Sequence, residues 1–453
     1  MPTMSADAAN AANGADDAEA ARDADTANGT HTAEAAKDAD AATGIDAANG
    51  TKAADAAAAT RQAAFVAERL LARNRVSAEF FPRECERLAL ACKEMAERFL
   101  RGGRLLAFGR RHSATDAQHV AVEFAHPVIV GKRALPALDL SLMFRDWLSC
   151  LLLPDDMAMG FGPPAGDPEV AEALRMARAR GAQTFALPGD EGDYALAAPS
   201  PDPFIHQELV EIVYHTLWET VHVFFEHREL GHEVGESAFL YPYLGKRKQD
   251  TSGVLAEVAA SIRLKAQEDE RLRAEVARTQ AEQVARTAAA IRERVAAGGK
   301  LILFGNGGSA TDANDWALDC VAPVVPREGF RPIPAVSLAM EPANLSALAN
   351  DIGPEAIFLR QLIAQARPPD VAVAISTSGG SANILATLAE ARKRGLLTVA
   401  LLGYDGGETV RRGLADLPLV VPCDYVPRIQ EIQASIYHVL LELLAEEEDG
   451  RAA

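Results

Sequence analysis

Two segments rich in glycine and serine have the composition of loops that bind phosphate. The first, Gly-Asn-Gly-Gly-Ser-Ala-Thr-Asp at 305–312, follows four apolar residues that predict a buried strand, Leu301–Phe304. Its glycines let the backbone turn tightly, and the residues after them predict a helix whose free N–H groups face the loop. Such N–H groups, together with the helix dipole, favour an anion. Because glycine-rich turns between a strand and a helix are common, this segment alone predicts a phosphate site only weakly.

The second segment, Ser376-Thr-Ser-Gly-Gly-Ser381, also lies between an apolar run and a predicted helix. Its four hydroxyl groups and its backbone N–H groups could surround a phosphate with neutral donors. The alternative is a serine-rich turn that only caps the following helix. Two such loops in one α/β unit favour the phosphate site, because polar loops at the carboxyl ends of parallel strands converge.

The residues around both loops alternate between predicted strands and helices, which indicates a parallel α/β sheet. A long charged helical stretch at 255–297 precedes them, with a break into two helices expected near Asp269. The strands are predicted at 301–304, 334–338, 371–375 and 397–402, and the helices at 310–320, 355–365, 381–394 and 429–447.

An earlier part of the chain repeats this pattern. Residues 102–117 align without a gap with 298–313, and Gln207-Glu208 matches Gln430-Glu431. We therefore predict a tandem duplication in which the first copy has lost a segment. Its predicted elements are two helices within 61–99, strands at 104–108, 137–140 and 184–187, and helices at 168–181 and 207–225.

The predicted organisation has four parts. They are a disordered tail (1–60), a first α/β domain (61–227), a linker (228–254) and a second α/β domain (255–447). The two domains are called the first half and the second half below.

Composition limits the kinds of partner. The formal net charge is −19, so binding to nucleic acid or to an anionic membrane is not expected. Residues 1–60 carry eleven Asp or Glu and three Lys or Arg among alanine, asparagine and glycine, which predicts disorder. Five scattered cysteines without a C-x-x-C pair fit a reducing compartment. Without an apolar run of roughly 18 residues or a signal-peptide pattern, the sequence predicts a cytoplasmic protein.

Several motifs, in order, resemble the sugar isomerase (SIS) domain and within it the phosphoheptose isomerase family. They are Gly305-Asn-Gly-Gly-Ser309, Asn350-Asp351, Ser376–Ser381, Leu402-Gly-Tyr-Asp-Gly-Gly407, and Arg428-Ile-Gln-Glu431 with His438. The resemblance covers nearly all of 250–447 and, more faintly, 61–226. It implies two tandem SIS domains, each a flavodoxin-like parallel sheet flanked by helices. It also implies an aldose–ketose isomerase that uses no nucleotide, forms tetramers and often binds zinc.

The resemblance further implies which residues bind the substrate and its phosphate. These are Asn306, Gly307, Gly308, Ser309, Asn350, Asp351, Ser376, Thr377, Ser378, Ser381 and Gln430.

Members of this family also carry a metal and acid–base set. It consists of His and Glu four residues apart on the helix after the first loop, and Gln and His eight residues apart on the last helix. In the first half all four positions match: His119, Glu123, Gln207 and His215. Spacing i,i+4 places the first two on one helix face, about 5–6 Å apart at Cβ. The resemblance therefore implies that these four residues hold Zn²⁺.

In the second half the same four positions are Asp315, Asp319, Gln430 and His438. Two depart from the family pattern, because a short aspartate reaches less far than glutamate and neither aspartate replaces an imidazole.

The loops of the first half have changed in the opposite way. Gly109-Arg-Arg-His-Ser113 stands where the second half has its glycine loop, and Gly162-Pro-Pro-Ala-Gly-Asp167 where it has its serine loop. The hydroxyl groups are gone and the prolines remove N–H donors. Arg110 and Arg111 could bind an anion or pair with carboxylates across an interface, and we favour the interface.

The two halves thus retain complementary parts, which predicts one composite site with phosphate on the second half and chemistry on the first. The expected reaction converts sedoheptulose 7-phosphate to D-glycero-D-manno-heptose 7-phosphate through an enediol, with Glu123 as base and His215 as acid. In a site confined to the second half, Asp319 and His438 would take these roles. A bound Zn²⁺ would polarise the carbonyl.

Two other functions stay open: a non-catalytic phosphosugar-binding regulator, and an isomerase of a different sugar phosphate. The expected assembly is a homo-oligomer, a dimer of tandem chains that mimics a tetramer.

Overall fold

The computed structural model describes residues 32–128, 132–229, 251–325 and 330–449. The chain forms two units, Met1–Ala57 and Ala58–Ala453, and each is described by itself. In the first unit the described residues are helical and begin α1 (Thr32–Leu100). The predicted disordered tail thus lies outside the described residues up to position 31, whereas from position 32 it is part of a helix. Alanine, which has the highest intrinsic helix propensity, accounts for this extension.

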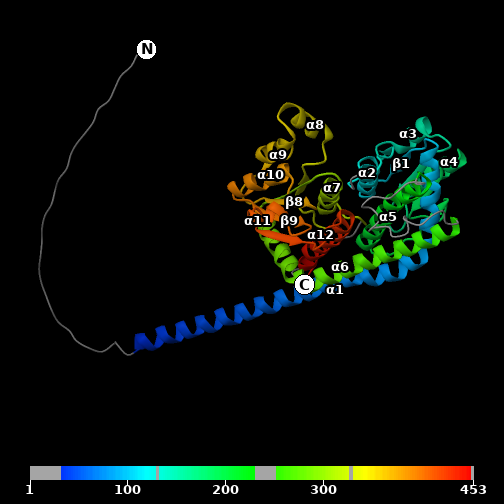
Figure 1. Ribbon diagram of the computed structural model, residues 1–453. Helices are drawn as coiled ribbons and strands as arrows, with labels where there is room; N and C mark the ends of the chain where they lie inside the picture. The colour runs from blue at the N-terminus through cyan, green and yellow to red at the C-terminus, as the bar shows by residue number, and fades with distance from the viewer. Residues whose placement is uncertain (1–31, 129–131, 230–250, 326–329, 450–453) are drawn as a thin grey trace, which may run out of the picture. The chain divides into compact units, whose positions relative to one another are not determined.

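The second unit contains two five-stranded parallel sheets with the same strand order. Figure 1 shows both sheets with helices packed around them. The first sheet has the order β2 (Ala137–Asp139), β1 (Leu105–Phe108), β3 (Met157–Phe161), β4 (Gln183–Leu187), β5 (Tyr194–Ala195). The second has the order β7 (Ala335–Ser337), β6 (Leu301–Gly305), β8 (Val371–Ser376), β9 (Leu397–Leu402), β10 (Leu417–Val420). This order is that of a flavodoxin-like sheet. The prediction of two tandem α/β domains with such sheets is confirmed.

Helices cover both sheets. In the first half they are α2 (Ser113–Ala125), α3 (Phe144–Leu151), α4 (Pro168–Ala179) and α5 (Pro203–Glu229). In the second half they are α6 (Thr251–Ala296), α7 (Gly308–Val321), α8 (Pro342–Asp351), the 3-10 turn η2 (Pro354–Ala356), α9 (Leu359–Gln365), α10 (Ala382–Lys393), α11 (Gly407–Arg411) and α12 (Val426–Asp449). The predicted linker falls mostly on 230–250, outside the described residues.

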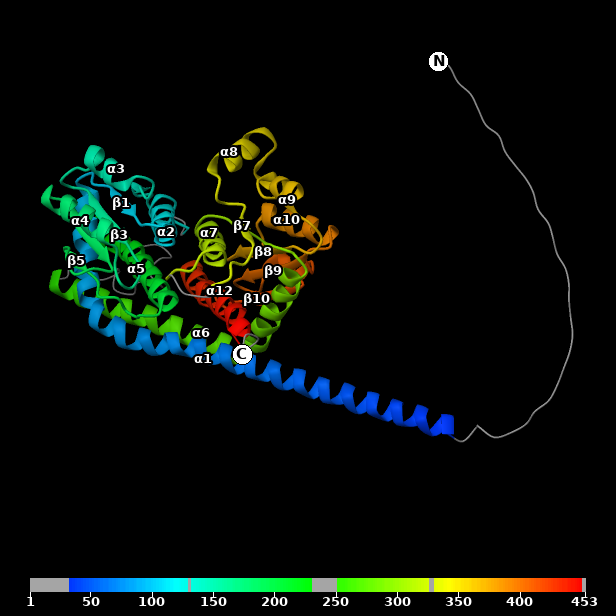
Figure 2. The same cartoon turned by 180° about the vertical axis from the view of Figure 1, so that it is seen from behind.

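The two halves meet through four helices. α2 contacts α7 and α5, and α12 contacts α5 and α7. Figures 1 and 2 show these helices together between the two sheets. Because α2 and α7 each follow the first strand of their sheet, the helices that begin at the two first loops face each other. This packing brings the predicted site residues of both halves into one region.

Several elements differ from the prediction. β3 was not predicted, because Met157-Ala-Met-Gly-Phe161 has no β-branched residue. Its Gly160 is needed for close packing, since a Cβ there would lie 2.6 Å from Val170 Cγ1 of α4. β5, β10, α3, α8 and α11 were missed as well.

Two helices are longer than predicted. α6 continues unbroken through Asp269, which is fully buried and lies 3.3 Å from Arg428 of α12. α1 likewise continues through Pro82, where two helices were expected. Phe81 and Cys85 beside this proline are buried in the core, so tertiary packing offsets the hydrogen bond that proline removes.

Buried ion pairs connect α1 to both halves. Arg73 donates to Glu208 of α5 at 2.9 Å and to Glu442 of α12 at 3.2 Å, and its side chain is 1% exposed. α1 also binds α6, because Asn74 donates to the Glu270 carbonyl at 2.6 Å. The two helices run side by side in Figures 1 and 2. Among the residues that the structure describes, no helix is long and apolar enough to span a membrane.

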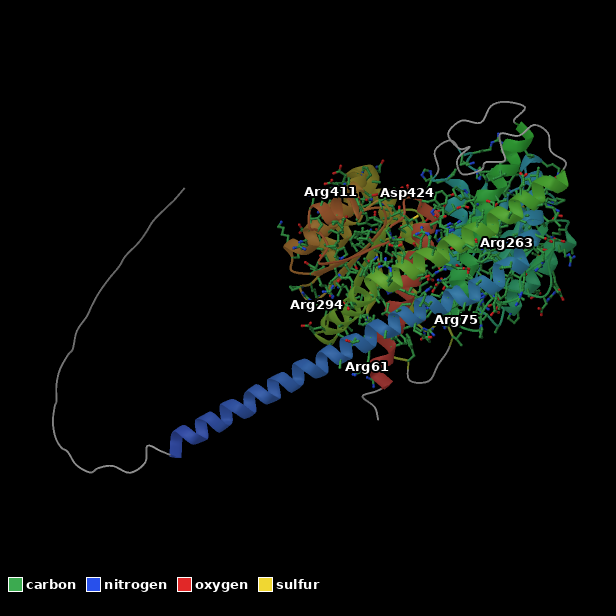
Figure 3. The ribbon with its side chains drawn as sticks, turned by 60° about the horizontal axis from the view of Figure 1, so that its bottom comes forward. Arg61, Arg75, Arg263, Arg294, Arg411 and Asp424 are labelled. Atoms are coloured by element: carbon green, nitrogen blue, oxygen red, sulfur yellow. The ribbon has the colours of Figure 1, made fainter. Side chains whose placement is uncertain are left out.

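Replacing Arg73 by alanine should strongly destabilise the protein. The change leaves Glu208 buried without its cation, which costs about 3–5 kcal/mol. The matched control is Arg75→Ala on the same helix (labelled in Figure 3), whose pair with Glu68 is 65% and 63% exposed. Such a pair contributes about 0–1 kcal/mol. Urea unfolding at neutral pH measures both variants, and equal losses of stability would contradict the structural role of Arg73.

Glu219 should make the protein sensitive to acid. Burial would raise the pKa of Glu219, but Lys265 and Arg428 outweigh this and hold it at about 2, against 4.5 for a free glutamate. Because the folded pKa is depressed, the stabilisation is complete above pH 4.5 and is lost as the pH falls towards 2. Its full size is roughly 3 kcal/mol.

The measurement is the urea midpoint between pH 5 and 2 for the wild type and for Glu219→Gln. The variant should be less stable at pH 5 and lose less stability on acidification. Parallel pH profiles would show that Glu219 does not carry this dependence.

Candidate active site

Four buried side chains from both halves converge at one point. α2 contributes His119 and Glu123, α5 contributes His215, and α12 of the second half contributes Gln430; we call these residues the His119 set. His119 Nε2 lies 3.4 Å from His215 Nε2, 3.8 Å from Glu123 Oε1 and 3.3 Å from Gln430 Nε2. None of the four is more than 2% exposed. The structure thus brings together three of the four residues that the resemblance implies for a metal.

The first loop of the second half directly adjoins the His119 set. A Cβ on Gly308 would lie 2.0 Å from Gln430 Nε2, 2.5 Å from His119 Nε2 and 3.1 Å from Glu123 Oε1. Only glycine can therefore occupy this position without displacing the set. The loop predicted to bind phosphate and the residues predicted to do chemistry are neighbours, although they come from different halves.

The His119 set fits a tetrahedral metal ion. Zinc–nitrogen bonds of about 2.0–2.1 Å place tetrahedral ligand atoms about 3.3 Å apart, close to the 3.3–3.8 Å observed here. Glu123 Oε2 and Gln430 Oε1 are buried without a hydrogen-bond partner in the described part of the chain. Turning the Gln430 amide by 180° would present its oxygen to the same point. The chemistry of the donors and their spacing both suit Zn²⁺.

A hydrogen bond orients one imidazole, and a carboxyl group lies near the corresponding nitrogen of the other. His215 Nδ1 donates to Glu431 Oε1 at 2.9 Å, and His119 Nδ1 lies 3.5 Å from Asp312 Oδ1. With Nδ1 beside a carboxyl group, each Nε2 faces the other ligand atoms, as is usual for metal-binding histidines.

Burial determines the charge of the set. It lowers the pKa of His215 to about 3 and, with the neighbouring His215, lowers the pKa of His119 well below its usual value. Both rings are therefore neutral, the form that binds metals. Burial also raises the pKa of Glu123 to about 8.

Gln207 lies elsewhere than the resemblance implies. It donates to Asp315 Oδ1 at 3.0 Å, in a second cluster formed around residues of the second half. The glutamines of the two last helices are exchanged between the halves, so Gln430 occupies the place expected for Gln207. The motif spacing within one half contains no signal for this exchange.

The two loops of the second half lie at the same edge of their sheet. β6 and β8 are adjacent, with Gly305 opposite Ile375, and Asn306 exchanges hydrogen bonds of 3.0 and 2.9 Å with Asn383. Ser309 and Ser376 are buried, and Ser376 Oγ accepts a hydrogen bond from Gly379 N at 3.2 Å.

The remaining residues predicted to bind substrate lie in two different places. Gly307, Thr377, Ser378 and Ser381 lie in the same two loops. Asn350 and Asp351 end α8, whose residues are not buried, and Asn350 donates to Asp351 at 2.7 Å.

In the first half an ion pair joins the corresponding loops. Arg110 lies 3.3 Å from Asp167 and 2.7 Å from Glu169, both in its own domain. Arg110 thus pairs within its own domain, with the end of the changed second loop and the first turn of α4. Its expected pairing across an interface stays a prediction. Arg111 is exposed and has a φ of 56°.

Sequence reasoning missed three buried carboxyl groups beside the His119 set. Asp116, Glu211 and Asp312 line one cavity with His119. Burial raises the pKa of each well above its usual value. Asp116 and Asp312 occupy the same position of the repeat, after a threonine, and this coincidence was the signal that could have identified them.

Comparison with known proteins agrees with this architecture. The SIS domain family matches residues 266–403. A phosphoheptose isomerase of Paramagnetospirillum magneticum is 43% identical over 173 residues, which are 36% of this chain and 88% of that protein. One of Sulfurimonas denitrificans is 45% identical over 150 residues, 33% of this chain and 74% of its own.

Solved structures are similar too. The phosphoheptose isomerase from Neisseria gonorrhoeae has 31% identity, with 42% of this chain and 98% of that chain covered at a TM-score of 0.38. A protein from Salmonella typhimurium LT2 described as sugar-binding covers 83% of this chain and 99% of its own, at 12% identity and a TM-score of 0.50. The latter likeness shows the fold alone. By its sequence matches, the chain belongs to the phosphoheptose isomerase family of SIS-domain proteins.

Proposed function

We propose that this phosphosugar isomerase converts sedoheptulose 7-phosphate to D-glycero-D-manno-heptose 7-phosphate through an enediol, at one site built from both halves. One observation carries the proposal: Gly308 of the second half adjoins His119 and Glu123 of the first. A substrate whose phosphate lies on the loops would extend towards these residues. The relatives named phosphoheptose isomerase support the choice of substrate.

The phosphate would bind to neutral donors. Backbone N–H groups at the start of α7 and α10, with the hydroxyl groups of Ser309, Ser376, Thr377, Ser378 and Ser381, would surround it. This arrangement suits a protein with a net charge of −19, in which the overall field repels anions.

Two residues would move the protons. Glu123 Oε2 has no hydrogen-bond partner among the residues that the structure describes, and it would carry the carbon-bound proton between C1 and C2. A pKa of about 8 lets this carboxylate act both as base and, once protonated, as acid near neutral pH. His215, neutral and with Nδ1 bound to Glu431, would accept the hydroxyl proton at Nε2 and return it to the other oxygen.

A zinc ion held by the His119 set would polarise the substrate carbonyl and stabilise the enediolate charge. A nitrogen cannot hold an ion and a proton together, so when His215 Nε2 is coordinated a water molecule would carry the hydroxyl proton in its place. We also infer a dimer of tandem chains, whose four domains would correspond to the tetramer that the resemblance implies.

The substrate and the composite site can be tested together. Purified full chain, supplied with Zn²⁺, should form aldose phosphate from sedoheptulose 7-phosphate, and a chelator should reduce the rate. His119→Ala and Ser376→Ala should each abolish turnover, because one removes a residue of the His119 set and the other a phosphate donor. The matched control is Ser346→Ala on exposed α8, which should keep wild-type activity.

A fully active His119→Ala variant would contradict the composite site. Turnover of another ketose phosphate, but not of sedoheptulose 7-phosphate, would contradict the proposed substrate and leave the proposed isomerase activity intact. A protein that binds phosphosugars without turnover would have the regulatory function instead.

Gly308→Ala should abolish activity without unfolding the protein. The added methyl group would occupy the space of Gln430 Nε2 and His119 Nε2, which are the ends of side chains and can move aside. The His119 set would then no longer converge. We expect at least a 100-fold loss of kcat/KM with unchanged far-ultraviolet circular dichroism, since misplacement by about 1 Å can cost this much. Wild-type kinetics would show that the loop does not approach the set this closely.

A further inference from the structure

A second buried cluster lies around the corresponding positions of the second half. It consists of His112, Asp315, Asp319 and His438, which we call the His112 cluster. In the repeat, Asp315 and Asp319 stand where the first half has His119 and Glu123, and His438 stands where it has His215. We propose that the His112 cluster is a second metal site of this chain, which holds a divalent transition-metal ion such as Zn²⁺ in a closed, structural role.

The ligand atoms of the cluster converge. Atoms of His112, Asp315 and Asp319 all lie within 4.8 Å of one another. His112 Nδ1 is 2.9 Å from Asp319 Oδ1, and His438 Nε2 is 3.6 Å from Asp319 Oδ2 and 3.7 Å from Asp315 Oδ2. Neighbouring ligand atoms of a tetrahedral zinc ion lie about 3.3 Å apart, and the separations observed here fall on either side of this value.

The same atoms have no other partner in the described part of the chain. His112 Nδ1, both carboxylate oxygens of Asp319, and His438 Nε2 are buried without a hydrogen bond. His112 and Asp319 are only 2.9 Å apart, yet their atoms do not have the geometry of a hydrogen bond. The side chains of Asp319 and His438 are 1% and 0% exposed. Without an ion these groups are satisfied only when both imidazoles are protonated and pair with the aspartates. Unpaired buried groups are costly, and a common ion would satisfy all of them at once.

Neighbouring residues hold the ligands in place. His438 Nδ1 donates to Glu208 at 2.9 Å, and Asp315 accepts hydrogen bonds from Thr115 at 2.7 Å and Tyr437 at 3.0 Å. These contacts direct His438 Nε2 and the aspartate oxygens into the cluster, as outer partners do in metal sites.

His112 makes this cluster different from the His119 set. It occupies the position of Gly308 in the repeat, and its ring restores the imidazole that is lost where Asp315 replaces histidine. With an ion bound in place of the imidazole protons, two carboxylates and two neutral imidazoles balance its double charge. The His112 ring also enters the cluster from the loop, where glycine leaves the other site open. A metal here would be enclosed by four protein ligands, as in structural zinc sites.

Metal content of the full chain tests this proposal. The protein is equilibrated with Zn²⁺, dialysed against metal-free buffer, and its zinc is measured by plasma mass spectrometry. His112→Ala and Asp319→Asn should each hold about one equivalent fewer than the wild type. The double variant His119→Ala/Glu123→Gln should retain the equivalent of the His112 cluster, and adding His112→Ala to it should remove that zinc.

Circular dichroism and urea unfolding show whether each variant is folded. If His112→Ala does not fold, Asp319→Asn still tests the site, because it keeps the shape of the side chain. Unchanged zinc content in both His112→Ala and Asp319→Asn would overturn the proposal. The proposal would also be overturned if the double variant His119→Ala/Glu123→Gln held no zinc at all. In that case two protonated histidines, and not a metal ion, would balance the charge of the aspartates. None of these outcomes depends on isomerase turnover, so the proposal can fail independently of the proposed function.

Discussion

The arrangement of the second unit depends on two reciprocal buried contacts between α5 and α12. Glu431 of α12 binds His215 of α5, and Glu208 of α5 binds His438 of α12, each at 2.9 Å. Both carboxylates also bind arginines, Arg428 and Arg73 respectively. Buried charges of this kind are costly unless every partner is present. The two halves therefore cannot separate or shift by a helical turn without leaving charges unpaired, and each histidine ring is oriented by the opposite half.

Under the proposed composite site, this exchange would let the two copies diverge without losing a complete site. The His119 set takes three residues from the first half, and its glutamine and glycine loop from the second. In the changed first loop of the first half, His112 lies beside Asp319 of the opposite cluster. Arg110 of the same loop pairs with Asp167 and Glu169. Likewise, Asp315 and Asp319 could replace ligands on α7 while the His119 set stayed intact. The packing of the two halves would therefore account for the loss of phosphate loops in one half and of metal ligands in the other.

The sequence predicted most of the fold, because most strands end in glycine or polar loops and the helices have clear apolar periodicity. It failed where tertiary contacts override local preference. Met157–Phe161 is a central strand because its neighbours β1 and β4 pair with it, although its residues have no strong strand propensity. α6 passes through Asp269 because Arg428 compensates the buried carboxylate.

The composition of the site was predictable only within one half. The resemblance implied His119, Glu123 and His215 at motif positions of the first half. The exchange of Gln207 and Gln430 depends on how the halves pack, which no motif within one half records.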